Sequence, residues 1–176
     1  DVYKRQVLAD KYGFTGIEEA CRACLGTTKE KSKEIMLQRY GEDFPYETYS
    51  AEASKLFHER YDGGRLPKKT GIEKILQALS QEGKKIALAS STRRQTVESQ
   101  LREAGLIGYF DKIICGDMVE KSKPEPDIYI RACKELGVLP EQAYAIEDSY
   151  NGIRSAYRAG MRPILSLIHI SEPTRL

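Results

Sequence analysis

The sequence has few of the residues and patterns that mark membrane, secreted or disulfide-rich proteins. Among its 176 residues there are two histidines, four cysteines and no tryptophan. No apolar run approaches the roughly 20 residues of a transmembrane helix, and no secretory signal peptide is visible, so no membrane association is expected. Four cysteines in a chain of this length require no disulfide framework. We therefore expect a cytoplasmic protein in a reducing environment.

Neither sign of charge dominates. The chain has 28 basic and 26 acidic residues, with a net charge of +2. This balance predicts no general attraction to nucleic acid or to a membrane surface. The hydrophobic share of 40% and the charged share of 31% are typical of a globular protein. The length suits one core with a small accessory domain, and we expect the intact protein to be a monomer that binds a small phosphorylated metabolite.

Residues 7–65 show only helical patterns. Apolar residues recur at helical spacing within 16–26, and 29–41 and 45–64 continue similarly. The glycines at 63 and 64 indicate a hinge after the last of these helices. We therefore predict a helical domain over 7–65.

Two smaller signals in this chain have ordinary structural readings. The pair Cys21-x-x-Cys24 has the spacing of a metal or redox site, but it is single, lies in a helix and has no nearby histidine. Core packing is the favoured interpretation. His58 and His169 have no defensible partners for a catalytic triad.

After Leu66 the pattern changes to alternating helices and strands. This alternation predicts a doubly wound parallel sheet covered on both faces, over residues 66–165. The expected helices are 71–83, 96–106, 126–138 and 152–161, and the expected strands are 84–90, 111–117, 143–149 and 163–168.

Polar residues follow three successive strands. Ser90 and Ser91 follow the first, the loop after the second carries Lys123, and Glu147 and Asp148 follow the third. Each signal alone is ordinary: a helix cap, a solvated lysine or a turn. Together they point to one site, because ligands of open parallel sheets bind at the carboxyl ends of the strands.

A phosphate with a magnesium ion would use all of these groups. Ser90, Ser91 and the backbone N–H groups that enter the next helix can bind phosphate oxygens. Lys123 supplies a point charge for the same anion. Glu147 and Asp148 suit Mg²⁺, which takes one or two protein carboxylates together with water and phosphate oxygens.

Three segments, "IALASS", "KSKPEPDIY" and "AIEDSYNGIRSAYRAGM", resemble motifs of the haloacid dehalogenase superfamily, within its β-phosphoglucomutase-like phosphatases. The resemblance covers about residues 7–165 and implies a Rossmann-like core with a small helical cap. It gives Ser90 and Lys123 catalytic roles on the phosphate. It assigns Glu147 and Asp148 to Mg²⁺, with Asp148 as the direct ligand.

The resemblance also suggests substrate contacts. Lys29 falls where relatives often carry an arginine for sugar phosphates, which is a departure from the pattern. Arg93 and Arg94 fall in a loop that faces the substrate in relatives.

One expected motif is absent. The family's first motif is a hydrophobic strand ending in Asp-x-Asp, which supplies the nucleophile and the acid–base group, and no segment here matches it. That strand would be central, between the strands at 84–90 and 143–149. Without it two strand edges lack partners. We therefore predict that this chain folds poorly or aggregates and is inactive toward phosphate esters.

Both ends of the chain differ from the family pattern. Residues 1–6 and 166–176 resemble translated sequencing-adapter sequence, so we expect the native segment to be 7–165.

The sequence favours a Mg²⁺-dependent phosphatase of small phosphorylated metabolites, chiefly sugar phosphates, that acts through an aspartyl phosphate. One alternative is a β-phosphoglucomutase-type phosphomutase, which would depend on a sugar bisphosphate. Another is a non-catalytic phosphate-binding module.

Overall fold

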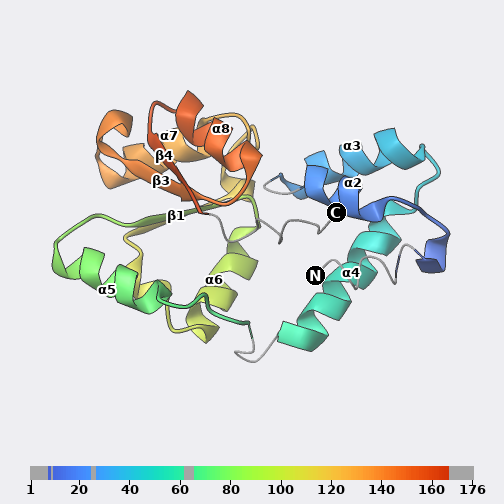
Figure 1. Cartoon of the computed structure of the whole chain (residues 1–176), viewed down its shortest axis with the longest axis horizontal. Helices are drawn as coiled ribbons and strands as arrows, with labels where there is room; N and C mark the ends of the chain where they lie inside the picture. Colours follow the sequence, from blue (N-terminus) through green and yellow to red (C-terminus); the bar gives the residue numbers. More distant parts are fainter. Residues whose placement is uncertain (1–7, 9, 25–26, 62–65, 167–176) are drawn as a thin grey trace, which may run out of the picture.

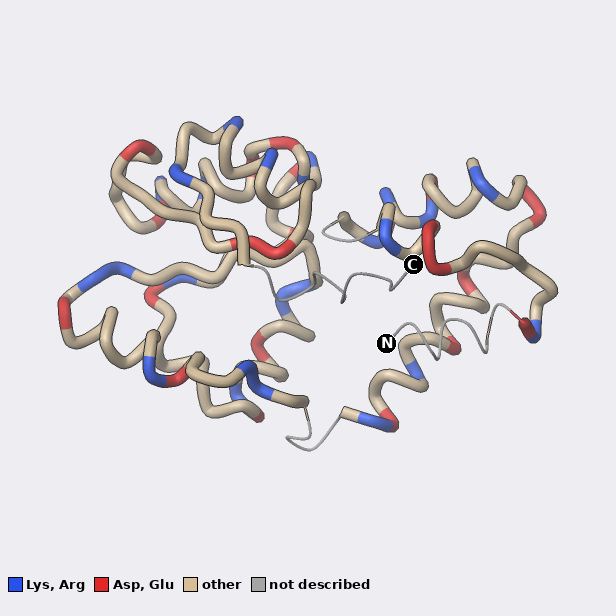
Figure 2. Tube along the Cα trace, in the orientation of Figure 1, with Lys and Arg blue, Asp and Glu red and all other residues tan. Residues whose placement is uncertain are grey.

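The computed structural model describes residues 8, 10–24, 27–61 and 66–166 (Figure 1). Within them a helical part precedes an α/β part. Basic and acidic residues are interspersed along both (Figure 2). No helix among these residues is long and apolar enough to span a membrane.

The helical part contains α2 (Ile17–Ala23), α3 (Lys29–Tyr40) and α4 (Tyr46–Tyr61). Helix α3 begins where the Thr28 side chain accepts a hydrogen bond from the backbone N–H of Lys31, and it ends at Gly41. The predicted helices are thus confirmed over the described residues, while 25–26 and the glycine hinge lie outside them.

The core of the helical part is one hydrophobic cluster. Cys21 is 5% exposed within it, and Cys24 packs against it. All four cysteines are free thiols. The packing interpretation of the two cysteines is therefore confirmed. The buried members of the cluster are Leu8, Ile17, Ala20, Cys21, Met36, Phe44, Tyr46 and Tyr49.

The α/β part follows the predicted alternation. Its elements are α5 (Ile72–Gln81), β1 (Ala87–Ser90), α6 (Arg94–Glu103), β2 (Lys112–Cys115), α7 (Asp127–Leu136), β3 (Tyr144–Glu147), α8 (Tyr150–Arg158) and β4 (Arg162–Leu165), with three short 3-10 turns. The strands predicted over 84–90, 111–117 and 143–149 are shorter in the structure than the sequence indicates.

The strands form two parallel pairs instead of one sheet. Strand β1 pairs with β2, and β3 pairs with β4. No described strand joins β1 to β3, so the predicted break at the centre of the sheet is confirmed. Whether folding suffers from it stays a prediction.

Helix packing differs on the two faces of these strands. Helix α7 packs against β1 and β2, and α8 packs against β3 and β4. On the other face, Tyr144 and Ile146 are each 60% exposed. Helix α6 also packs against β2. The predicted doubly wound arrangement is therefore confirmed, although no described helix packs over the exposed side of β3.

Residues from both strand pairs share one core. Ile114 of β2 and Ala145 of β3 belong to a single hydrophobic cluster with residues of α7 and α8, and Ala87 and Ala89 of β1 pack against it. Burying a large side chain such as Ile114 stabilises the fold by about 1.5–3 kcal/mol. The two strand pairs are thus held by one helical layer. The remaining buried members are Ile128, Tyr129, Ala132, Ala156 and Ala159.

Candidate active site

A cavity of about 1430 Å³ lies between the helical part and the α/β part. Lys29 and His58 line it from the helical part, and Arg93 and Lys123 line it from the α/β part. Arg93 and Glu30 lie 4.0 Å apart across it. The loops that follow β1 and β2 therefore open into a space large enough for a small metabolite.

Lys123 lies at the inner wall of this cavity. It is 5% exposed. Its Nζ donates a hydrogen bond to the backbone oxygen of Ala89 at 3.2 Å and pairs with the carboxylate of Glu147. Its Nζ also lies 5.0 Å from the centre of the Tyr129 ring. The structure thus brings the predicted lysine to the ends of β1 and β3.

Glu147 is held by three donors. Besides Lys123, the hydroxyl of Tyr129 donates to its Oε1, and the hydroxyl of Ser149 donates to its Oε2 at 3.3 Å. A Cβ on Gly152 would lie 1.9 Å from Oε2, so the glycine leaves room for the carboxylate. This carboxylate is therefore balanced by the chain's own groups, and a buried charge needs such partners.

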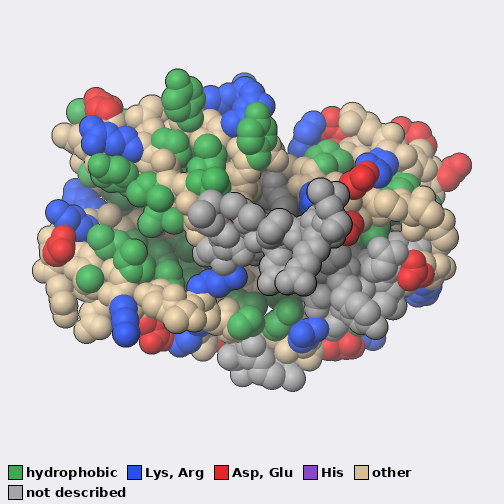
Figure 3. Space-filling view, viewed as in Figure 1, with side chains coloured by type: hydrophobic (Ala, Val, Ile, Leu, Met, Phe, Trp, Pro, Cys, Tyr) green, Lys and Arg blue, Asp and Glu red, His purple; other side chains and the backbone are tan. Residues whose placement is uncertain are grey.

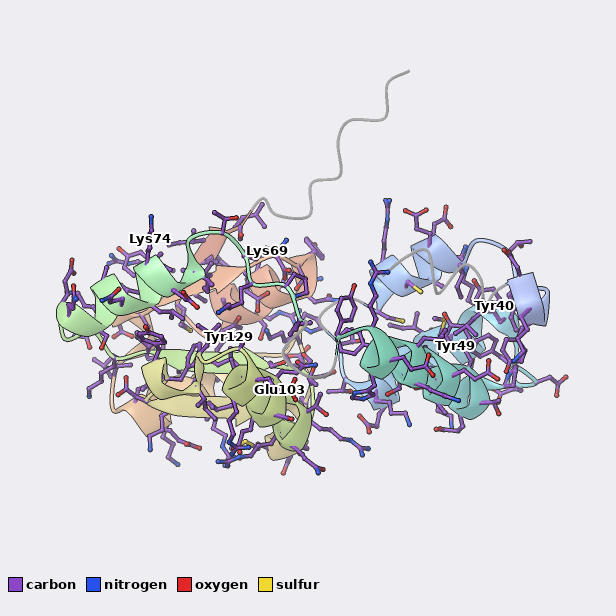
Figure 4. All side chains as sticks on the ribbon, turned by 90° about the horizontal axis from the view of Figure 1, so that it is seen from below. Tyr40, Tyr49, Lys69, Lys74, Glu103 and Tyr129 are labelled. Carbon is purple, nitrogen blue, oxygen red and sulfur yellow. The ribbon has the colours of Figure 1, made fainter. Side chains whose placement is uncertain are left out.

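Tyr129 is the member of this site that sequence reasoning missed. It is 6% exposed on the inner face of α7, and Figure 4 labels it within the α/β part. Burial, with a smaller contribution from the charge of Glu147, raises the pKa of Tyr129 well above its ordinary value. The phenol therefore stays a donor to Glu147. The available signal was its position on the apolar stripe of α7.

The loop after β1 makes local bonds. The Ser90 hydroxyl accepts a hydrogen bond from Thr92 N at 3.2 Å, while Ser91 lines the cavity. A Cβ on Gly116 would lie 2.2 Å from the backbone oxygen of Ser91, so this glycine allows the loops after β1 and β2 to touch. Ser91 thus faces the cavity more directly than Ser90 does.

The side chain of Asp117, from the turn after β2, caps the amino end of α6. Its Oδ1 accepts a hydrogen bond from the backbone N–H of Arg94 at 3.1 Å, and Asp117 lines the cavity. One backbone donor predicted for phosphate is therefore already used. Sequence analysis assigned no role to Asp117.

The predicted substrate contacts separate into two groups. Arg93 and Lys29 line the cavity, although Lys29 Nζ also pairs with Glu47 at 3.0 Å. Arg94 does not line it and pairs with Glu98 at 2.6 Å along α6. Since this pair follows i,i+4 spacing on an exposed helix face, Arg94 points along the helix instead of toward the cavity.

The predicted metal ligands lie in different environments. Glu147 is 8% exposed and engaged by Lys123, whereas Asp148 is exposed at the end of β3. The described residues contain no group of three His, Cys, Asp or Glu side chains that could enclose a metal ion. Mg²⁺ needs only one or two protein carboxylates when phosphate and water supply the rest. Asp148 therefore fits a magnesium site completed by substrate, and Glu147 fits poorly.

Comparisons with known proteins agree with this architecture. A family model described as haloacid dehalogenase-like hydrolase matches residues 2–165. The phosphorylated carbohydrates phosphatase of Thermotoga maritima is 29% identical over 174 residues, which cover 96% of this chain and 77% of that protein.

Two solved structures extend the comparison. The crystal structure of a CbbY variant from Rhodobacter sphaeroides with xylulose-1,5-bisphosphate is 32% identical, has a TM-score of 0.73, and is matched over 90% of this chain and 74% of its own. A β-phosphoglucomutase from Clostridium difficile is 24% identical with a TM-score of 0.75, over 93% of this chain and 75% of its own, and shows the fold alone. With the family model matched over most of its length, this chain belongs to the haloacid dehalogenase-like hydrolases.

Proposed function

We propose that the protein is a Mg²⁺-dependent phosphatase of small phosphorylated metabolites, with sugar phosphates as its substrate class. The observation that carries this proposal is the buried Lys123 at the strand ends, on the wall of a cavity of about 1430 Å³. The similarity to a phosphorylated carbohydrates phosphatase and to a CbbY protein crystallised with a sugar bisphosphate supports the substrate class.

The proposed reaction is an in-line transfer of the phosphoryl group to an aspartate. A carboxylate oxygen attacks phosphorus, the P–O bond of the ester breaks, and the leaving oxygen takes a proton from the acid–base carboxyl group that accompanies the nucleophile in the first motif. Water then hydrolyses the aspartyl phosphate and releases inorganic phosphate. Lys123, with Ser90 and Ser91 beside it, would stabilise the negative charge on the transferring oxygens.

Magnesium would be held chiefly by Asp148, and when bound it neutralises charge on the phosphate. The helical part would act as a cap that excludes water from the cavity. Lys29 and Arg93 would contact the rest of the substrate from opposite walls. None of the described carboxylates follows a strand as Asp-x-Asp, so the attacking group has to come from outside the described residues.

The site is tested by binding of inorganic phosphate in the presence of Mg²⁺, measured by calorimetry. The double variant Lys123→Met/Glu147→Gln removes both buried charges and avoids a lone one. We expect it to bind at least about tenfold more weakly, since a charge-assisted bond contributes about 1.5–3 kcal/mol. Lys134→Ala, at an exposed position of α7, is the matched control. Unchanged binding by the double variant would contradict the site.

Turnover by this chain alone gives a second test. We expect no release of phosphate from a panel of sugar phosphates, because no described aspartate is placed to attack. Measurable Mg²⁺-dependent turnover would overturn the assignment of the nucleophile. A protein that interconverts glucose 1-phosphate and glucose 6-phosphate only with a bisphosphate would be a phosphomutase. Phosphate binding without any turnover in the completed fold would indicate a binding module.

A further inference from the structure

The helical part lines the cavity with as many carboxylates as lysines. The lysines of this wall, within the described residues, are Lys29 and Lys31 at the start of α3. The carboxylates are Glu30 and Glu34, from the same turns of that helix. Figure 3 shows basic and acidic side chains next to one another over the helical part. Apart from His58, this wall therefore carries no net charge.

Both lysines of this wall are paired with carboxylates. Lys29 Nζ lies 3.0 Å from Glu47 Oε2, and Lys31 Nζ lies 2.7 Å from both carboxylate oxygens of Glu34. Glu47 comes from α4 and is not among the residues that line the cavity; it borders a smaller hollow of about 420 Å³. The Lys29 ammonium is thus bound to a carboxylate that lies outside the cavity.

Glu47 also holds a second lysine. Lys33 Nζ lies 3.0 Å from Glu47 Oε1, so one carboxylate bridges two lysines on successive turns of α3. The hydrogen bond from Lys33, followed by that from Lys29, lowers the pKa of the Glu47 carboxyl. The carboxylate therefore stays ionised at neutral pH, and Lys29 keeps its partner.

The α/β part faces this wall with Arg93. Its guanidinium lies 4.0 Å from the carboxylate of Glu30. In the proposed function, Arg93 and Lys29 contact the part of the substrate beyond the phosphate. Since each has a carboxylate beside it, neither presents an uncompensated charge to a second anion. The space next to α3 is thus suited to an uncharged group.

Hydroxyl groups supply most of the other polar contacts on this wall. Thr27 and Ser32 line it near the start of α3, and Ser50 and Ser54 line it from α4. Thr27 Oγ1 and Ser32 Oγ lie 2.9 Å apart and share a hydrogen bond. A hydroxyl both donates and accepts, so these groups match the hydroxyls of a sugar. They bring no positive charge for a second phosphate.

We propose that Glu47 is a positioning residue that sets specificity: by holding Lys29, it restricts the site to metabolites with one phosphate and an otherwise neutral, hydroxyl-bearing body. This inference rests on the proposed function and narrows its substrate class. The single phosphate lies at Lys123, and the uncharged end of the substrate faces α3. A bisphosphate would bring its second phosphate against Glu30 and Glu34, whose charges repel it. A phosphomutase that depends on a bisphosphate is therefore disfavoured.

The binding test compares glucose 6-phosphate with glucose 1,6-bisphosphate, by calorimetry of the full chain with Mg²⁺. We expect the bisphosphate to bind at most about twofold more tightly, the statistical gain from two equivalent ends. Glu47→Gln releases Lys29, so it should raise the affinity for the bisphosphate at least about fivefold and change that for glucose 6-phosphate less than about twofold. Glu18→Gln breaks an exposed ion pair with Arg22 on α2. It is the matched control and should change neither affinity.

A further variant shows whether the gain comes from the released ammonium. In Lys29→Met/Glu47→Gln the higher affinity for the bisphosphate should disappear, whereas a loosened helix would leave it. Three results would overturn the inference. They are bisphosphate binding at least about tenfold tighter than that of glucose 6-phosphate in the unaltered chain, no gain in Glu47→Gln, and a gain that persists without Lys29.

A measurement without ligand separates this inference from the proposed function. Carbon-13 NMR follows the titration of the Glu47 carboxyl, whose pKa we expect below the ordinary glutamate value and closer to it in Lys29→Met/Lys33→Met. An ordinary pKa in the unaltered chain would reject the inference alone. Absence of glucose 6-phosphate binding, with the Glu47 pKa still low, would reject the proposed function and the substrate preference with it.

Discussion

The ammonium of Lys123 and the carboxylate of Glu147 form an ion pair with side chains only 5% and 8% exposed. The two residues come from the loop after β2 and from the end of β3. Their pairing explains why the two adjacent carboxylates at the end of β3 differ: Glu147 is turned inward to the lysine, and Asp148 is left at the surface. In the proposed phosphate site, the pair would also determine how much of the lysine's charge faces the cavity.

Breaking this pair on one side should destabilise the fold strongly. Glu147→Gln or Lys123→Met leaves one buried charge without its partner, so we expect each to lower the free energy of unfolding by about 3–5 kcal/mol. The double variant should lose less than the sum of the two. Urea unfolding of the four proteins measures this coupling, and additive losses would show that the two groups do not interact.

Removing the Tyr129 hydroxyl should have a smaller effect. Tyr129→Phe deletes a buried hydrogen bond to a charged group, which contributes about 1.5–3 kcal/mol. The control is Tyr144→Phe, whose hydroxyl accepts an exposed hydrogen bond from Arg162 at 3.1 Å; we expect a loss below about 0.5 kcal/mol there. Equal losses for the two variants, by chemical denaturation, would argue against a special role for Tyr129.

A methyl group at Gly152 should displace Glu147. The added Cβ would fall 1.9 Å from its carboxylate, so Gly152→Ala has to move the carboxylate or the start of α8. We expect a loss of at least about 2 kcal/mol and weaker phosphate binding. Gly108→Ala is the control, because nothing lies within 4 Å of its Cβ position. A Gly152→Ala protein with normal stability would contradict the described packing.

Cys115 should make stability fall at alkaline pH. Burial, followed by the charge of Asp117, raises the pKa of the Cys115 thiol from 9.0 to about 11. Below pH 9 the thiol is protonated in both states, so it causes no change. Between pH 9 and about 11 the unfolded state loses the proton that the folded state keeps, and stability declines as pH rises. Tyr129 acts in the same direction at higher pH.

This pH dependence is measured by urea unfolding from pH 8 to 11. Cys115→Ala should flatten the decline between pH 9 and 11. At pH 8 we expect iodoacetamide to modify the half-buried Cys24 before Cys115 in the folded chain. Rapid alkylation of Cys115 under native conditions would contradict its burial.

Much of the fold could be predicted from the sequence, because its signals are local. Helical spacing predicted α2, and the alternation after Leu66 predicted every helix and strand of the α/β part. The positions of Ser90, Lys123 and Glu147 after successive strands also predicted that they would meet. What sequence reasoning missed concerns long-range contacts: the exposed side of β3 and the hydrogen bond from Tyr129 to Glu147.

The sequence by itself determined the order of the elements, the family motifs and the set of polar groups at the strand ends, since each depends on residues close along the chain. Only the tertiary structure decided that Lys123 pairs with Glu147 instead of leaving both carboxylates for a metal. It also decided that β1 and β3 stand apart with open edges. Both outcomes depend on which distant groups meet inside a low-dielectric interior, where a charge needs a partner and a strand edge needs a neighbour.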